Sequence, residues 1–290
     1  QDVAYFVPAI WGMTDRVNLH TANITGPVYG MKIKDLHLTM LDETILKGRL
    51  EIPKNMDKMD EAYFLERIKL FQTSVADVEK LNLSPFLEDG KKHLEIPNEY
   101  RAANKIRVVE AHMDGYLSSF VVDGDVYSGL GDIHSANGLK FFKGTREQCQ
   151  LNNVPYTGKD TVYYYVGVEG EVKQDVIVEN LNLGALARNE LLGSASGFVR
   201  ILPGSYGFDL NSMNLDFAGH FDHVDLSDYP YHAINIKEGN FSRNRFTGKI
   251  DIEDDNLALN YDGYIDLNRD LTFDFTVQID HAHLAELTNT

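Results

Sequence analysis

Two pairs of histidines are the first residues whose types and spacing could support chemistry. His281 and His283 lie two positions apart, so in an extended strand they would share a face and could bind one metal ion. His220 and His223 would point to opposite faces of an extended strand. The chain has no His-Glu-x-x-His motif, and polar residues near the end of a strand explain both pairs more simply. We therefore predict no metal ion.

Acidic residues offer a second kind of chemistry. Asp251, Glu253, Asp254 and Asp255 form a dense group, but it lacks the glycine and the regular acidic spacing of a calcium-binding loop. A solvated hairpin turn is the favoured interpretation. Any two acidic strands could supply the carboxylate pair of a glycosidase, yet nothing in the sequence singles out one pair.

The remaining candidates are a cysteine and a short glycine motif. Cys149 lies among Gln and Asn residues with no histidine nearby, so the sequence does not favour a reactive nucleophile. Gly129-Leu130-Gly131 lacks the third glycine and the following helix of a dinucleotide site, and a strand bend explains it better. No Gly-x-Ser-x-Gly motif occurs. We predict no catalytic residue, no cofactor and no enzymatic activity.

Composition excludes several further classes of function. The 290 residues carry a net charge of −17, which disfavours nucleic acid as a partner and a basic patch that docks on an anionic membrane. One cysteine excludes an internal disulfide. No stretch reaches the ~20 apolar residues of a membrane-spanning helix, and no signal peptide is visible after Gln1. The way the chain begins and ends leads us to expect a piece of a longer protein.

Alternation of apolar and polar residues dominates the last third of the chain. Residues 246–252, 257–267 and 273–279 each place apolar side chains on one face and polar side chains on the other. Turns are expected at 253–256 and 268–270. This pattern predicts antiparallel strands with one wetted face.

The same alternation recurs upstream with interruptions. It predicts strands around residues 17–52, 109–122, 163–168 and 210–236, with a bulge or turn between Ile33 and Leu36 and a hairpin at Asp123-Gly124. Short helices are expected in three places: after a capping box at Ser74–Asp77, within 183–192, and within 281–287. Residues 55–61 form a polar connector.

Spacing along the chain suggests a repeated module. Gly26, Gly115 and Gly204 each follow a predicted strand and are 89 residues apart. Together with the recurring short helices, they predict one elongated β body with approximate modules 1–82, 83–192 and 193–290. Residues 142–161 read as an extended loop or insertion in the second module.

The apolar face must be covered. About a dozen large apolar residues line one face of the last strands, and burying each contributes ~1.5–3 kcal/mol. Their sum exceeds the ~5–15 kcal/mol net stability of a typical fold. The predicted helices are too few and too short to cover this face. Either the sheet folds against itself as a sandwich or closed barrel, or it curls into a trough that holds apolar ligand chains.

Several segments together resemble a known family. They combine strands, glycines and short helices, and the resemblance is densest after residue 179; the segments are 179–186, 191–197, 207–215, 246–263 and 280–284. They are similar to the translocation-and-assembly-module (TamB) proteins of the AsmA-like group of diderm bacteria. Residues 142–161 and Cys149 depart from that pattern.

The resemblance implies a fold, a place and partners. Such proteins form a long β-taco or half-pipe that carries phospholipids between the inner and outer membranes. The chain would lie in the periplasm, anchored to the inner membrane through a segment outside it. Its partners would be phospholipid acyl chains and, through the longer chain, an Omp85-type (BamA-like) outer-membrane barrel.

We therefore predict an all-β, elongated, antiparallel β-taco or half-pipe with a few short helices. Fourteen residues are predicted to line its lipid groove: Phe217, Ile234, Ile236, Phe246, Ile250, Ile252, Leu257, Leu259, Tyr261, Ile265, Phe273, Phe275, Val277 and Ile279. Two alternatives stay open. One is a scaffold that pairs with nascent outer-membrane strands by β-augmentation, and the other is an extracellular adhesin or glycan-binding β protein.

Overall fold

The computed structural model describes residues 17–27, 30–54, 62–81, 93–96, 98–135, 137–160, 162–169, 175–187, 189–207, 212–227, 229–266 and 272–287. The predicted connector 55–61, the predicted turn 268–270 and Leu210 lie outside these residues.

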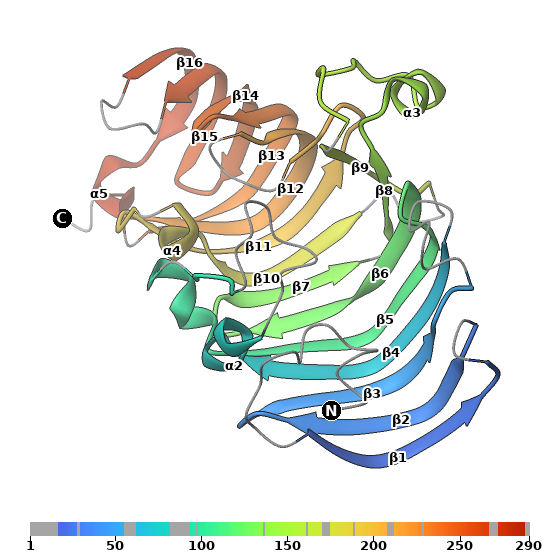
Figure 1. The fold of residues 1–290 in the computed structure, drawn as a ribbon. Coiled ribbons are helices and arrows are strands. Elements are labelled where there is room, and N and C mark those ends of the chain that lie inside the picture. Colours follow the sequence, from blue (N-terminus) through green and yellow to red (C-terminus); the bar gives the residue numbers. More distant parts are fainter. Residues whose placement is uncertain are drawn as a thin grey trace.

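Antiparallel strands form one open sheet (Figure 1). Its main path runs in chain order through β1 (Val17–Thr25), β2 (Lys32–Met40), β3 (Thr44–Glu51), β4 (Tyr63–Ser74), β5 (Lys105–Tyr116), β6 (Ser119–Ser128), β7 (Gly131–Ser135), β10 (Val176–Asn182), β11 (Leu192–Ile201), β12 (Asn214–Leu226), β13 (Tyr229–Ser242), β14 (Arg245–Asp254), β15 (Leu257–Asp266) and β16 (Thr272–Ala282). β1 and β16 are the two ends of this path. The strands are curved in Figure 1 and form one open antiparallel sheet, so the all-β half-pipe predicted from the sequence is confirmed.

The sheet branches at β6. The first half of β6 pairs with β8 (Leu139–Lys143) and its second half pairs with β7. β8 then pairs with β9 (Tyr163–Gly167), and Tyr206 forms bridges to both β9 and β12. The β8–β9 connection contains the helix α3 (Arg146–Leu151), so residues 142–161 are not simply an extended loop.

Short helices line one rim of the trough (Figure 1). They are α2 (Val75–Lys80), the 3₁₀ helix η3 (Asn98–Ala103), α4 (Leu183–Ala187) and α5 (Leu284–Leu287). These fulfil the three sequence-based helix predictions. Val75, Ala103 and Leu130 form a buried cluster that joins α2, η3 and the β6–β7 turn.

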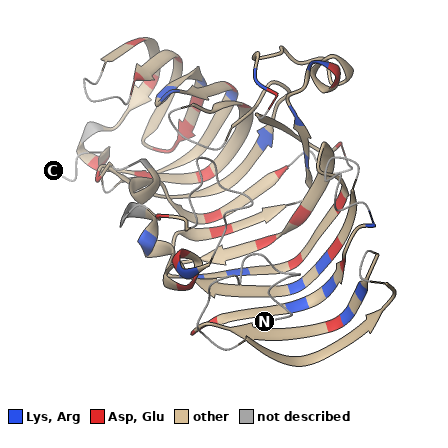
Figure 2. Ribbon diagram, viewed as in Figure 1, with Lys and Arg blue, Asp and Glu red and all other residues tan. Residues whose placement is uncertain are grey.

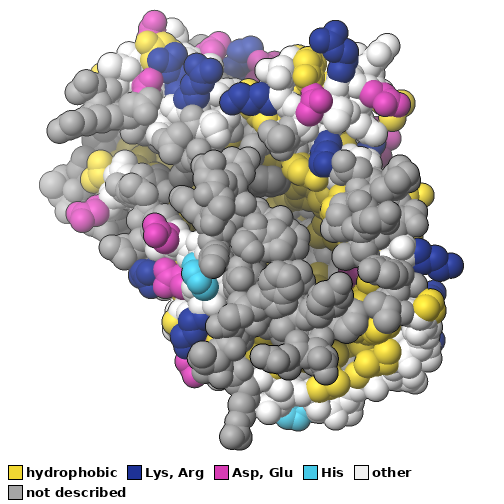
Figure 3. All heavy atoms as spheres, viewed as in Figure 1, with side chains coloured by type: hydrophobic (Ala, Val, Ile, Leu, Met, Phe, Trp, Pro, Cys, Tyr) yellow, Lys and Arg dark blue, Asp and Glu magenta, His cyan; other side chains and the backbone are white. Residues whose placement is uncertain are grey.

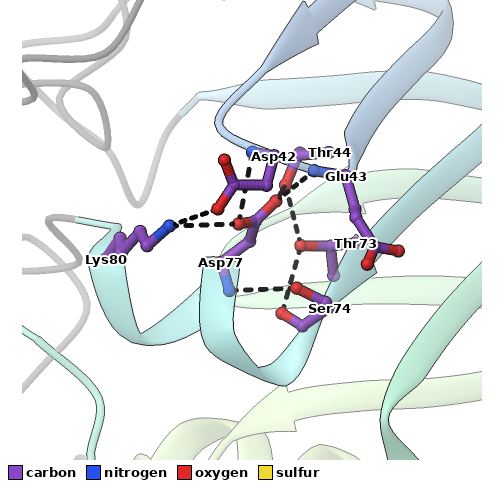
Figure 4. A network of polar contacts seen from close by, with 7 residues as sticks. All are labelled: Asp42, Glu43, Thr44, Thr73, Ser74, Asp77 and Lys80. Atoms are coloured by element: carbon purple, nitrogen blue, oxygen red, sulfur yellow. Dashed lines mark hydrogen bonds and ion pairs between the residues drawn. The ribbon is translucent and has the colours of Figure 1, made fainter.

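A buried carboxylate ties α2 to the sheet (Figure 4). Asp77 is fully buried and accepts hydrogen bonds from the backbone N of Glu43 and the hydroxyl of Thr44, both at 2.8 Å. Ser74 caps the helix by accepting from the backbone N of Asp77 at 3.2 Å, which confirms the predicted N-cap, while the Asp77 carboxylate binds the β2–β3 turn instead of completing a capping box. Ser74 satisfies one backbone donor at the start of the helix, while the carboxylate of Asp77 binds α2 to the β2–β3 turn.

Bulges set the curvature of the strands. The predicted irregularity between Ile33 and Leu36 is confirmed as a register shift, with Asp35 at a φ of 53°. Glu110 in β5 and Asn180 in β10 also adopt positive φ beside register shifts. A bulge bends its strand and increases the local twist, so bulges in several strands help the sheet to form a trough.

Three local predictions were wrong. Asp123-Gly124 is not a hairpin: both residues lie inside β6, and the β5–β6 turn follows the Tyr116–Ser119 pair. Gly129 and Leu130 form the turn of the β6–β7 hairpin rather than a strand bend, because Ser128 pairs with Gly131. Gly115 does not follow a strand but lies within β5.

Candidate functional site: the apolar wall of the trough

The fourteen predicted groove residues share one face of the sheet. The register aligns them in cross-strand rows: Ile236, Ile250, Tyr261 and Val277 form one row, and Phe246, Ile265 and Phe273 belong to another. Directly opposed residues of antiparallel strands point to the same face. We call this face the inner face and the opposite one the outer face.

One row crosses the whole sheet. It follows directly opposed pairs through all strands of the main path and holds thirteen apolar side chains and one glycine: Leu19, Leu38, Leu46, Phe71, Val108, Val126, Ile133, Val178, Gly197, Phe221, Ile234, Ile252, Leu259 and Ile279. We call it the apolar row. The strands are spaced by about 4.8 Å, so the apolar row extends over roughly 60 Å along the sheet.

The wall is most exposed at the two ends of the sheet, whereas most of its residues are half-buried and Val178 and Ile234 are buried. Ile279 and Leu19, at the two ends of the apolar row, are 58% and 53% exposed, and Phe273 is 60% exposed. The buried clusters found among the described residues lie beside the wall: one joins the helices at the rim, and the other joins Phe142, Cys149 and Tyr164 around α3. Figure 3 shows hydrophobic side chains gathered over the first strands.

Glycines and aromatic residues alternate on the inner face of the last strands. Gly239, Gly248 and Gly263 form a row flanked by Phe217 and Phe275. A Cβ added at Gly248 would lie 2.8 Å from Cζ of Phe246, and one at Gly239 would lie 3.0 Å from Cζ of Phe217. The rings of Phe246 and Phe217 therefore lie over the backbone of these glycines, where a side chain would collide with them.

One polar atom interrupts this part of the wall. The hydroxyl of Tyr261 is buried and has no hydrogen-bond partner among the described residues. Burial, and to a lesser extent the charge of Asp262, raises the pKa of this hydroxyl, so Tyr261 stays neutral. The ring stacks near Phe275, with the centroids 5.3 Å apart.

The histidines considered as metal ligands have other neighbours. Nδ1 of His220 lies 2.8 Å from Oδ1 of Asn235, and His223 is opposite His232 in the register. The rings of His281 and His283 are 5.7 Å apart. Among the residues that the structure describes, no three His, Cys, Asp or Glu side chains converge as they would around a metal ion.

Sequence reasoning located only the C-terminal half of the wall. It did not assign Phe71, Val108, Val126, Ile133 and Val178 to the groove, although their alternation with polar neighbours was available as a signal. The bulges hid it, because each one shifts the period of two by one residue. Ile68 and Phe71, for example, are three positions apart yet share the inner face across a register shift between β3 and β4.

Comparisons with known proteins add no identification. No family model, no curated protein and no solved structure matches the chain. Within the described segments, no helix is both long enough and apolar enough to cross a membrane. The resemblance to TamB and AsmA-like proteins therefore stays a prediction from the sequence.

Proposed function

We propose that this protein is a section of a bridge-like lipid conduit that carries phospholipids between the inner and outer membranes of a diderm bacterium. The observation that carries this proposal is the apolar row, which runs without a charged residue from β1 to β16 on a face that is exposed at both ends of the sheet and mostly half-buried between them. In this proposal the section lies in the periplasm, is anchored through a segment outside this chain, and leads to an Omp85-type barrel.

The physical argument concerns the cost of moving acyl chains through water. Each methylene removed from water contributes about 0.8 kcal/mol, so an apolar path lowers the cost at every point along it. Contiguous exposed apolar surface usually marks a binding site. A wall of this kind needs no catalytic group, and the net charge of −17 keeps the body soluble.

Lipid contact at the wall provides the test. Lipids extracted from the purified protein are identified by mass spectrometry, and a photoreactive phospholipid acyl chain is crosslinked to the protein. Phe275→Arg places a charge on the inner face of β16 and should reduce crosslinking to this strand at least tenfold. Thr276→Arg is the matched control, because Thr276 is exposed on the outer face, where it opposes Asp262.

Two results would contradict the conduit. One is equal crosslinking of Phe275→Arg and the unmodified protein. The other is an equal loss in Thr276→Arg, which would point to a general effect of charge rather than to contact at the wall.

A second candidate is favoured by the edge of the sheet. β16 is the last strand of the path and is exposed along most of its length, so its free edge could pair with a nascent outer-membrane strand. Proline substitutions along β16 should then impair assembly more than Phe275→Arg does. The adhesin alternative required a sandwich with a closed apolar face, whereas the described strands form one open sheet whose inner face is exposed at both ends.

A further inference from the structure

Both edges of the sheet are open among the described strands. β1 and β16 end the main path, and no described strand pairs with the second edge of either one. An open edge presents unpaired N–H and C=O groups, and proteins usually protect it with Lys, Pro or a short strand. β1 is nine residues long with no Asp, Glu, Lys, Arg or Pro, and β16 is eleven residues long with no Lys, Arg or Pro. Both strands can therefore pair with a further strand.

The inner face is most exposed at these two edges. Leu19 in β1 and Ile279 in β16 are both more than half exposed, although residues of the same apolar row are buried in the middle of the sheet. Phe273 and Phe275 add two more exposed rings on β16. A neighbouring strand would place side chains about 5 Å away on the same face. Pairing at the edges would thus remove apolar surface from water.

The connections at the helical rim indicate what kind of strand fits beside β16. α2 follows β4, α4 follows β10 and α5 follows β16, and all three helices lie along the same rim (Figure 1). In the first two cases the next strand of the main path pairs antiparallel with the strand before the helix: β5 pairs with β4, and β11 pairs with β10. Among the described strands, the corresponding place beside β16 is open.

The first strand of a second copy has the direction that this place requires. The main path contains fourteen strands, and each one is antiparallel to the next. An even number of strands makes β1 and β16 run in opposite directions. A second copy shifted along the sheet would therefore bring its β1 antiparallel to β16 with both inner faces on the same side. Leu19 of the second copy could then lie beside Ile279 and continue the apolar row.

The charges on the outer face agree with this arrangement. When Leu19 lies beside Ile279, the antiparallel direction puts the exposed Asp274 near Asn23 of the second copy. Asn23 is opposite Lys34, which is exposed on β2. Two strand spacings, about 10 Å, would separate the backbones that carry Asp274 and Lys34, which is close to the screening length at physiological salt. Figure 2 shows that Lys and Arg lie side by side across β2, β3 and β4.

We propose that copies of this chain assemble head to tail, with β16 of one copy paired to β1 of the next. The occupant of each open edge is a second copy of the same chain. The interface is heterologous, so it forms an open series of oligomers rather than a closed dimer. It repeats between copies the pairing that joins β4 to β5 and β10 to β11 within one copy. The proposal does not depend on lipid binding.

Sedimentation velocity over a series of concentrations tests the assembly. The average mass of the full chain should rise with concentration through a series of oligomers. Ile279→Lys and Leu19→Lys each place a charge at one edge, and each should weaken self-association about tenfold, because the new charge would be desolvated beside apolar residues. Both positions are more than half exposed in one copy, so the fold should tolerate the changes.

Mixing the two edge variants gives the sharpest result. Leu19→Lys keeps an intact β16 edge, and Ile279→Lys keeps an intact β1 edge. The two variants should therefore form one-to-one dimers that do not grow further. This result also shows that both variants are folded. A mixture that stays monomeric would overturn the head-to-tail pairing.

Charge reversal tests the electrostatic part of the interface. Asp274→Lys should weaken self-association about threefold, and adding Lys34→Asp in the same chain should restore it. Glu253→Lys is the matched control, because it makes the same change in net charge on the outer face of β14, away from both edges. Equal weakening by Asp274→Lys and Glu253→Lys would contradict a specific contact at the edges.

The remaining outcomes are equally decisive. A chain that is monomeric at every concentration would overturn the assembly, as would loss of association in Ile279→Lys but not in Leu19→Lys, which would indicate pairing between two β16 edges. Leu151→Lys changes a 74% exposed leucine in α3, away from both edges, and an equal loss there would indicate general apolar attraction. Lipid crosslinking to a monomeric chain would leave the conduit standing without the assembly, and self-association without crosslinking would support the assembly alone.

Discussion

The first four strands and the last five strands share the apolar row but differ in charge. Both contribute apolar side chains to this row. Residues 30–74 contain 8 acidic and 8 basic residues, whereas residues 214–287 contain 15 acidic and 5 basic residues. The apolar row is therefore common to two regions whose charge balance is very different.

The two regions also differ in continuity. Among the last strands, β14 and β15 pair without a register shift from Arg245–Asp266 to Asp254–Leu257. In the first region the pairing of β3 and β4 has a register shift between Lys47 and Gly48 and stops at Arg49–Arg67. The β14–β15 pair is therefore the more regular of the two.

Each region has a buried aspartate whose carboxylate accepts hydrogen bonds from backbone donors near the ends of the strands. Asp77 holds the β2–β3 turn through Glu43 and Thr44. Asp254 accepts from the hydroxyl of Tyr229 and from the backbone N of His232 and Asn256. Burial alone would raise the pKa of Asp254, but these hydrogen bonds hold it below its usual value. Both carboxylates therefore satisfy backbone donors that strand pairing leaves free.

The largest expected effect on stability follows from removing the carboxylate of Asp77. Asp77→Ala leaves the Thr44 hydroxyl and the backbone N of Glu43 without their acceptor in a buried place, and should lower the free energy of unfolding by about 3 kcal/mol. Because each strand contacts mainly its neighbours, the loss should be local. Amide hydrogen exchange should speed up in β2–β4 and stay unchanged in β12–β16.

Two controls sharpen this prediction. Asp77→Asn keeps one acceptor oxygen and should lose less stability than Asp77→Ala. Asp42→Ala removes a carboxylate that is 78% exposed and pairs with Lys80, so it should change stability by less than about 0.5 kcal/mol. Faster exchange across both regions in Asp77→Ala would show that the sheet unfolds as one unit, and the proposed independence of the regions would be wrong.

A smaller effect is expected at Glu66, on the inner face of β4. The pKa of Glu66 is raised from 4.5 to about 7, so between these values the folded chain holds the proton more tightly than the unfolded chain. Stability should therefore fall as the pH rises through this window. Glu66→Gln should raise the free energy of unfolding by about 1–2 kcal/mol at pH 8, allowing for the partial exposure of Glu66. The gain should vanish at pH 4.5 and below.

Urea denaturation at several pH values measures this gain. Glu253→Gln provides the control, because Glu253 is an exposed carboxylate on the outer face of β14 in the acidic region. It should give no gain that appears only above pH 7. A gain for Glu66→Gln of equal size at pH 4.5 and pH 8 would rule out ionisation of Glu66 as its cause.

The same comparison explains what the sequence could predict. Strands β14 and β15 and the turn between Asp254 and Leu257 were predicted correctly, because their alternation is unbroken. β4 was missed: Glu66 takes an inner-face position, and the register shift puts Ile68 and Phe71 on one face. Helix α3 was missed as well, although Thr145 caps it by accepting from the backbone N of Gln148, a spacing visible in the sequence.

The point at which β3 and β4 stop pairing could not be predicted either, because no residue type at Arg49 or Arg67 marks it. The wall of the last strands was predictable because one local rule, the period of two, determines it. The register between two strands depends on how both strands pack, and the sequence of one strand alone does not encode it.

The smallest expected effect concerns two tyrosine hydroxyls on the inner face, those of Tyr261 and Tyr165. Tyr261→Phe removes a buried hydroxyl that has no partner among the described residues, and should raise the free energy of unfolding by up to about 1 kcal/mol. Tyr165, an inner-face residue of β9 opposite Phe141, donates to the carbonyl of Gly207 at 3.0 Å. Tyr165→Phe should therefore lose about 1 kcal/mol. Urea denaturation measures both; if Tyr261→Phe also loses stability, its hydroxyl has a partner and the wall of the last strands is not uniformly apolar.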